Sequence, residues 1–201
     1  MGKRWRLALA MLAAIGVAAC LTGCSQQDAV KAAETIHTYL PAVVALANDA
    51  AAIASGLDPA EAQTVQAVST KVQAELQELE TLSGAYVAAP SGDGWTKLEA
   101  VVDALVSDAD QGLLAALAIK DPASQTKAKV ALSALDAAVH VLDGYLLAAR
   151  TPAETQAAAA QRTVKLQSVA QYWSPRDWQR VEVAFGAPGE ELYGVELRRG
   201  F

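Results

Sequence analysis

Apolar residues recur at alternating steps of three and four along most of the chain, which is the spacing of one face of an α-helix. Similar stripes run over residues 65–86, 95–116 and 128–149, while the alternating pattern of a strand is scarce before the last few residues. The pattern predicts an all-α fold, an up-down bundle of four amphipathic helices with short connections. The first stripe comprises Ala33, Ile36, Leu40, Val43, Ala47, Ala50, Ala54 and Leu57.

Breaks in the pattern separate the predicted helices. Asp58-Pro59 and Asp121-Pro122 each combine a residue suited to a helix N-cap with proline at the first helical position. The stretch Pro-Ser-Gly-Asp-Gly at 90–94 is the clearest break between two stripes. Pro41 lies inside the first stripe, and because proline lacks a backbone N–H, it predicts a kink or a split near Tyr39.

The C-terminal part continues the helical pattern less regularly. An alanine-rich run at 153–161 predicts a fifth helix that ends near Trp173, since Ser174-Pro175-Arg176-Asp177 has the residues of a new helix cap. A short helix that carries Trp178, Val181 and Phe185 should follow, and then an irregular tail, because Gly186, Pro188 and Gly189 interrupt it. We expect the bundle to span 28–150 and the segment 151–201 to pack on it as an extension.

The N-terminus has the three parts of an export signal. Lys3, Arg4 and Arg6 precede an uncharged run of 14 residues, 7–20, which is shorter than the ~20 residues that span a hydrocarbon core. The segment closes on Leu-Thr-Gly-Cys at 21–24. Residues 1–24, and no others, resemble the signal peptide of bacterial lipoproteins. The resemblance implies that the lipoprotein signal peptidase removes 1–23, that Cys24 carries acyl chains, and that 24–27 is a short tether.

This resemblance also limits the chemistry of the mature chain. Cys20 leaves with the signal peptide and the thiol of Cys24 becomes a thioether, so cysteine nucleophiles, zinc-thiolate sites and iron–sulfur clusters are excluded. In lipoproteins of bacteria with two membranes, Asp at the second mature position favours the inner membrane. That position here is Ser25. We therefore expect a membrane-anchored protein outside the cytoplasm, on the periplasmic side of the outer membrane in a cell that has one.

The charge of the chain narrows the choice of partners. The whole sequence carries a formal net charge of −6, which becomes −9 without the leader, because the leader holds three basic and no acidic residues. An acidic body is repelled by phosphate polyanions. We expect no nucleic-acid partner. The lipid on Cys24 would make the membrane one partner. The other partner could be an envelope protein or a glycan, and the sequence does not decide between them.

The two histidines form one candidate site. Glu34 and His37 have the E-x-x-H spacing of di-iron bundles, and His140 follows Asp136 by one turn. In an up-down bundle the first and fourth helices are neighbours, and both histidines fall at a similar height. These residues could bind a metal or sense protons. A second E-x-x-H and its partner glutamates are missing, however, and both histidines flank the apolar stripes, which favours a surface or boundary position for each.

Aromatic and basic residues near the C-terminus form the other candidate. Two interpretations of Trp173, Arg176, Trp178 and Arg180 are open. In the favoured one, the tryptophans pack on the bundle with arginines over their faces. In the other, they form an exposed contact for a protein or glycan, since Trp and Arg are enriched in binding hot spots.

Common enzyme motifs are missing from the sequence. It contains no G-x-S-x-G, Walker, Rossmann or H-E-x-x-H pattern. We therefore expect a non-enzymatic, lipid-anchored helical module without a cofactor, which binds or scaffolds other molecules of the envelope. A metal-binding or proton-sensing bundle is the first alternative, and an envelope hydrolase is a distant second.

Overall fold

The computed structural model describes the backbone of residues 3–149 and 169–186, and the side chains of 26–149 and 169–186. Five helices account for nearly all of these residues, and no strand occurs among them. They are α1 (Lys3–Ala54), α2 (Pro59–Ala88), α3 (Gly92–Leu117), α4 (Pro122–Ala148) and the short α6 (Pro175–Phe185). The predicted all-α bundle with a C-terminal helix is confirmed.

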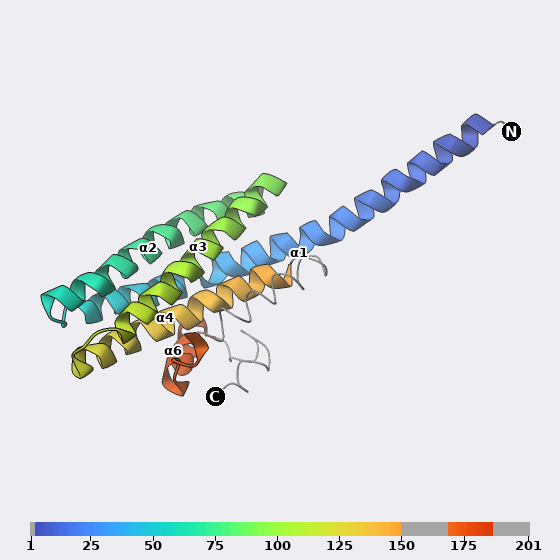
Figure 1. Cartoon of the computed structure of the whole chain (residues 1–201). Coiled ribbons are helices and arrows are strands. Elements are labelled where there is room, and N and C mark those ends of the chain that lie inside the picture. Colours follow the sequence, from blue (N-terminus) through green and yellow to red (C-terminus); the bar gives the residue numbers. More distant parts are fainter. Residues whose placement is uncertain (1–2, 150–168, 187–201) are drawn as a thin grey trace.

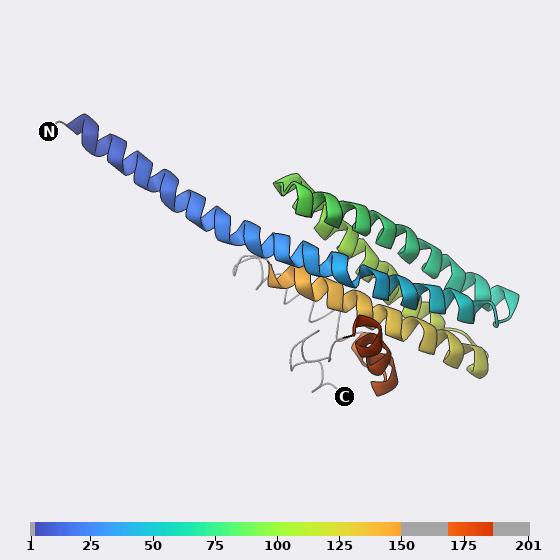
Figure 2. The ribbon, with the colours of Figure 1, turned by 180° about the vertical axis from the view of Figure 1, so that it is seen from behind.

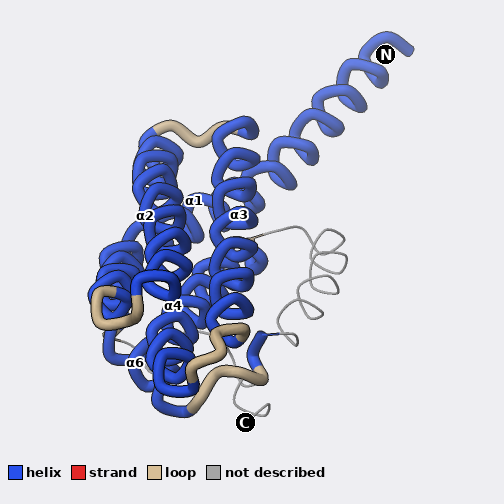
Figure 3. Tube along the Cα trace, turned by 60° about the vertical axis from the view of Figure 1, so that its left-hand side comes forward, coloured by secondary structure: helices blue, strands red, loops and turns tan. Residues whose placement is uncertain are grey.

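The four long helices form a closed bundle. Each helix packs against the next along the chain, and α1 also packs against α4. Short loops join them (Figure 3). The α2–α3 connection and the C-terminal end of α4 lie at the same end of the bundle, where the N-terminal part of α1 extends beyond the other helices (Figures 1 and 2).

The predicted stripes form the core of this bundle. Ile36, Leu79, Leu105 and Leu135 are fully buried, one from each long helix. Alanines at 33, 47, 50, 54, 128 and 131 are also buried and let the helices approach closely. The helices α2 and α3 approach closely at Gly112, where an added Cβ would lie only 2.4 Å from Cγ1 of Val68.

The helix starts follow from local side-chain chemistry. Ser91 accepts a hydrogen bond from the backbone N–H of Gly94 at the start of α3. Asp121 caps α4 through the N–H of Ser124, at 2.7 Å. These bonds satisfy backbone donors that the first turn of a helix leaves unpaired. Asp58 occupies the N-cap of α2 without a side-chain bond, and Pro59 at the first helical position removes one of those donors instead.

From Pro41 the sequence predicted either a kink or a split of the first helix near Tyr39, and the split is wrong. The helix α1 continues through Pro41 to Ala54. Pro41 is exposed, whereas its neighbours Leu40 and Val43 are buried in the core. The missing hydrogen bond to the carbonyl of His37 therefore falls on the solvent side, where water can replace it, while packing holds the helix on both sides of the proline.

The helix α6 packs on the outside of the bundle, against α4 and α1. Tyr39 from α1 forms ring contacts with Tyr145 from α4 and with Phe185 from α6. Arg180 adds a hydrogen bond of 2.7 Å to the carbonyl of Val130 in α4 and an ion pair with Asp49 in α1. The predicted fifth helix lies outside the described residues except for its end, where Val169 and Ala170 are helical and the chain turns at 171–172.

Two segments, Gln26–Ala54 and Pro122–Ala148, are long and apolar enough to cross a membrane by length and composition alone. Core helices pass the same test. In α4, 72% of the apolar window is buried inside the protein, so its hydrophobicity is explained by packing. The predicted irregular tail at 187–201 and the side chains of the leader lie outside the described residues.

Candidate functional site

A row of polar side chains is enclosed in the most deeply buried part of the structure. Residues 131–142 of α4 are all buried, because α6 and the turn before it cover the face of α4 that points away from the bundle. Ser133, Asp136 and His140 are the polar residues of this stretch, and their steps of three and four place them on one helix face. Ser133 bonds to the carbonyl of Lys129 in its own helix. Asp136 and His140 need partners from elsewhere.

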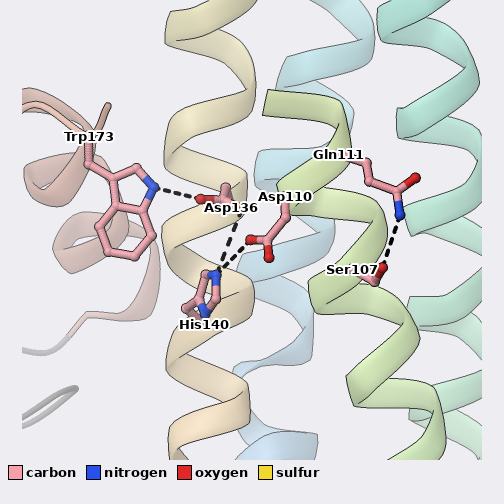
Figure 4. Close-up of polar contacts among 6 residues, drawn as sticks. All are labelled: Ser107, Asp110, Gln111, Asp136, His140 and Trp173. Atoms are coloured by element: carbon pink, nitrogen blue, oxygen red, sulfur yellow. Dashed lines mark hydrogen bonds and ion pairs between the residues drawn. The ribbon is translucent and has the colours of Figure 1, made fainter. Parts of the chain in front are cut away.

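The helix α3 supplies the partner of His140. Nε2 of His140 lies 2.9 Å from Oδ1 of Asp110 in α3 and 4.0 Å from Oδ1 of Asp136 (Figure 4). Because a carboxylate only accepts hydrogen bonds, the imidazole donates to Asp110 from Nε2. The side chain of His140 is 0% exposed and that of Asp110 is 14% exposed. Asp110 thus connects the buried imidazole to the solvent.

Asp136 is a fully buried carboxyl group. Its Oδ2 accepts a hydrogen bond of 2.6 Å from Nε1 of Trp173, whereas its Oδ1 has no hydrogen-bond partner among the described residues. Burial is the main cause that raises the pKa of Asp136 well above its usual value, and the negative charge of Asp110 adds to it. The bond from Trp173 acts in the opposite direction and stabilises the ionised form.

The turn before α6 positions Trp173. Ser174 and Asp177 form a reciprocal capping box, in which Asp177 accepts from the N–H of Ser174 at 2.8 Å and Ser174 accepts from the N–H of Asp177. This cap fixes the chain directly after Trp173. The indole then lies 5.6 Å from the ring of His140 and stacks on Trp178, with ring centroids 6.5 Å apart. Trp173 and Trp178 therefore close the polar centre from outside.

The arrangement can hold a small positively charged species. One imidazole nitrogen and two carboxylate oxygens, from His140, Asp110 and Asp136, lie within 4.8 Å of one another. These are donors for a proton or for a metal ion. The burial of Asp136 and His140 leaves no surface at which a larger substrate could contact both.

The structure brings together only half of the predicted histidine site. Asp136 and His140 lie close together, as their spacing suggests. His37 and Glu34 are exposed and lie outside this group, and Nδ1 of His37 forms a hydrogen bond of 3.1 Å with Ser83 in α2. The surface or boundary position expected for the histidines is therefore right for His37 and wrong for His140, because the C-terminal segment covers the outer face of α4.

Asp110 is the member of the centre that the sequence did not identify. It directly follows Ala109 of the third apolar stripe, so it lies at the edge of the buried face of α3. That edge position is the signal that could have pointed to it. Nothing in the spacing of α3 relates Asp110 to His140, since the pairing depends on how two helices cross.

The four predicted contact residues near the C-terminus separate into buried and accessible groups. Trp173 and Trp178 are buried, at 4% and 9% exposure, so they pack on the bundle, and an exposed contact made by these tryptophans is contradicted. Arg180 is held by Val130 and Asp49. Arg176 is exposed.

Known proteins give no guide to the role of this centre. No protein-family model, no curated protein and no solved structure matches the chain.

Proposed function

We propose that this chain is a lipoprotein of the cell envelope, held at a membrane by acyl chains on Cys24, and that its bundle is a non-enzymatic binding or scaffold module. The observation that carries the proposal is the order of basic residues, apolar run and Leu21-Thr22-Gly23-Cys24 at the N-terminus. Ser25 at the second mature position favours the outer membrane in a cell with two membranes.

The position of Cys24 relative to the bundle supports this proposal. Cys24 precedes the core residue Ala29 by five positions in α1. At the same end, Gln27, Val30 and Pro90 line an open groove between α1 and the α2–α3 connection. Acyl chains on Cys24 would place this end next to the bilayer. Each buried CH₂ contributes about 0.8 kcal/mol, and more than one chain gives lasting attachment, which an acidic domain needs on an anionic surface.

The enclosed polar centre favours a binding or scaffold role over catalysis. Asp136 and His140 are each 0% exposed, whereas catalysis on an external substrate requires groups that reach it. A partner would then bind the exposed surface of the bundle. An envelope protein or a glycan is the class of partner that we propose, and the acidic charge argues against nucleic acid.

Cysteine substitutions in the full chain, expressed in bacteria, test the lipid anchor. Detergent phase partitioning and intact mass should place the wild type in the detergent phase, beginning at an acylated Cys24. Cys24→Ala should accumulate as an unprocessed precursor. Cys20→Ala is the matched control and should be processed and acylated like the wild type, because Cys20 is removed. A wild-type protein that stays in the aqueous phase with an unmodified Cys24 would overturn the proposal.

A further inference from the structure

Three potential metal ligands converge between α3 and α4. Nε2 of His140 lies 2.9 Å from Oδ1 of Asp110 and 4.0 Å from Oδ1 of Asp136. Ligand atoms at the usual 2.0–2.2 Å from a zinc ion are themselves about 3–3.5 Å apart. The two observed distances lie on either side of that range. Small side-chain shifts would therefore place all three atoms around one ion.

A second observation points to a ligand at this position. Oδ1 of Asp136 is buried, faces His140 and has no hydrogen-bond partner among the described residues (Figure 4). Leaving a buried carboxylate oxygen without a partner is unfavourable. Trp173 occupies the other oxygen of the same carboxylate and so directs Oδ1 towards the imidazole. Such an outer hydrogen bond is typical of carboxylates that bind metals.

We infer that Asp110, Asp136 and His140 bind a divalent transition-metal ion such as Zn²⁺, a function separate from the membrane anchor. An imidazole with two carboxylates suits Zn²⁺, whereas Mg²⁺ and Ca²⁺ prefer oxygen ligands alone. The ion would neutralise the two carboxylates and give Oδ1 of Asp136 its partner. Asp110 is partly exposed and provides the route for the ion and for a water as fourth ligand.

Binding requires a change of protonation at His140. In the absence of metal, Nε2 carries the proton that it donates to Asp110. To bind the ion through Nε2, the neutral imidazole must carry its single proton on Nδ1 instead, so the ring changes tautomer. His37 and Glu34 have no part in the site, because His37 contacts Ser83 and both side chains are exposed.

Equilibrium dialysis of the full chain in mild detergent tests the site. After treatment with a chelator, the protein is dialysed against Zn²⁺ with a large excess of Mg²⁺, and bound zinc is measured by elemental analysis. We expect one Zn²⁺ per chain and a higher thermal unfolding midpoint, because the ion binds only the folded state. Asp110→Asn, which keeps the side-chain shape at a partly exposed position, should weaken binding at least about tenfold.

Matched controls separate this site from general binding of cations to an acidic protein. Asp103→Asn removes an exposed carboxylate of α3, and His37→Gln removes the other histidine. Both should bind zinc like the wild type. X-ray absorption of the bound zinc should show nitrogen and oxygen ligands without sulfur. The inference is overturned when the wild type binds no zinc, when Asp110→Asn binds it equally well, when His37→Gln loses it, or when the spectrum contains sulfur.

Discussion

Trp173 donates its indole N–H to Oδ2 of Asp136 over 2.6 Å, and the two side chains are only 4% and 0% exposed. Asp136 lies in the middle of α4, and Trp173 precedes Ser174, the N-cap of α6. The bond therefore attaches the C-terminal segment to the bundle at its most buried point. It also satisfies Oδ2 of Asp136, whereas Oδ1 of the same carboxyl group has no hydrogen-bond partner among the described residues.

Removing this donor should destabilise the fold. Trp173→Phe keeps an aromatic ring but leaves both oxygens of Asp136 without a partner. A buried acceptor that loses its donor costs about 1–3 kcal/mol, and more when it is charged. We expect the free energy of unfolding in urea to fall by at least about 2 kcal/mol.

A double variant distinguishes the lost hydrogen bond from lost packing. Trp173→Phe combined with Asp136→Leu removes donor and acceptor together, and replacing both partners by apolar groups can be nearly neutral. The double variant should recover most of the stability lost by Trp173→Phe. Equal instability of the single and double variants would assign the loss to the smaller ring instead.

The sequence predicted the bundle well because its helices are specified locally. The stripes that contain Leu40, Leu76, Leu105 and Leu135 recur at helical spacing, and those residues are buried in the core. Caps such as Asp121 and Ser174 act within one turn, so they can be identified without tertiary information. A split near Tyr39, one of the two outcomes predicted from Pro41, does not occur, because tertiary packing on both sides of the proline overrides its local effect.

The polar centre was only partly predictable because it depends on three separate segments. Asp136 and His140 are one turn apart on α4, so their proximity follows from the helix itself. Asp110 and Trp173 reach them only through the crossing of α3 and the return of the chain over α4. Residues 131–142 are apolar on every side of the helix apart from three polar side chains, and such a stretch indicates a buried helix. That signal predicts that His140 is buried, whereas the position of His140 beside the apolar stripe suggests a boundary residue.

Charge in the core of α4 should not be tolerated. Leu135 is 0% exposed, and Leu135→Asp would place an unpaired carboxylate among apolar side chains. We expect the free energy of unfolding to fall by at least about 3 kcal/mol. Circular dichroism during urea unfolding measures this loss. Val183→Asp is the control, because Val183 is 78% exposed on α6, and it should change stability by less than about 0.5 kcal/mol. A tolerated Leu135→Asp would contradict the packing of α4.

The close approach of α2 and α3 should make Gly112 sensitive to a single methyl group. A Cβ at this position would lie 2.4 Å from Cγ1 of Val68, so Gly112→Ala forces the helices or the valine to shift. Overpacking costs about 1–3 kcal/mol, and the better helix propensity of alanine offsets about 1 kcal/mol of it. We expect a net loss of up to about 2 kcal/mol by thermal or urea unfolding.

Val68→Ala should relieve this clash. In the Val68→Ala/Gly112→Ala variant the side chain that meets the new methyl is shorter. The double variant should therefore be more stable than the sum of the two single effects predicts, by about 1 kcal/mol. Strictly additive effects would show that the two residues do not limit the approach of the helices.

The contact of Glu75 with Asp108 should make stability depend on pH. Burial, aided by hydrogen bonding with Asp108 and the negative charge of that residue, raises the pKa of Glu75 from 4.5 to about 7. Lys71, which pairs with Asp108 at 3.3 Å, acts in the opposite direction, and Glu78 raises the pKa slightly further. Between pH 4.5 and 7 the folded state thus holds a proton that the unfolded state has released.

Within this window the unfolded state binds fewer protons than the folded state, so stability should fall as pH rises through it. Above the window both states have lost the proton, and stability should become level. The raised pKa of Asp136 acts in the same direction. We expect a higher unfolding midpoint at about pH 5 than at about pH 8. Glu75→Gln should reduce this difference by stabilising the protein at the higher pH only. Glu78→Gln removes an exposed carboxylate one turn away on the same helix, so an equal effect of both substitutions would point to general charge repulsion instead of the Glu75–Asp108 contact.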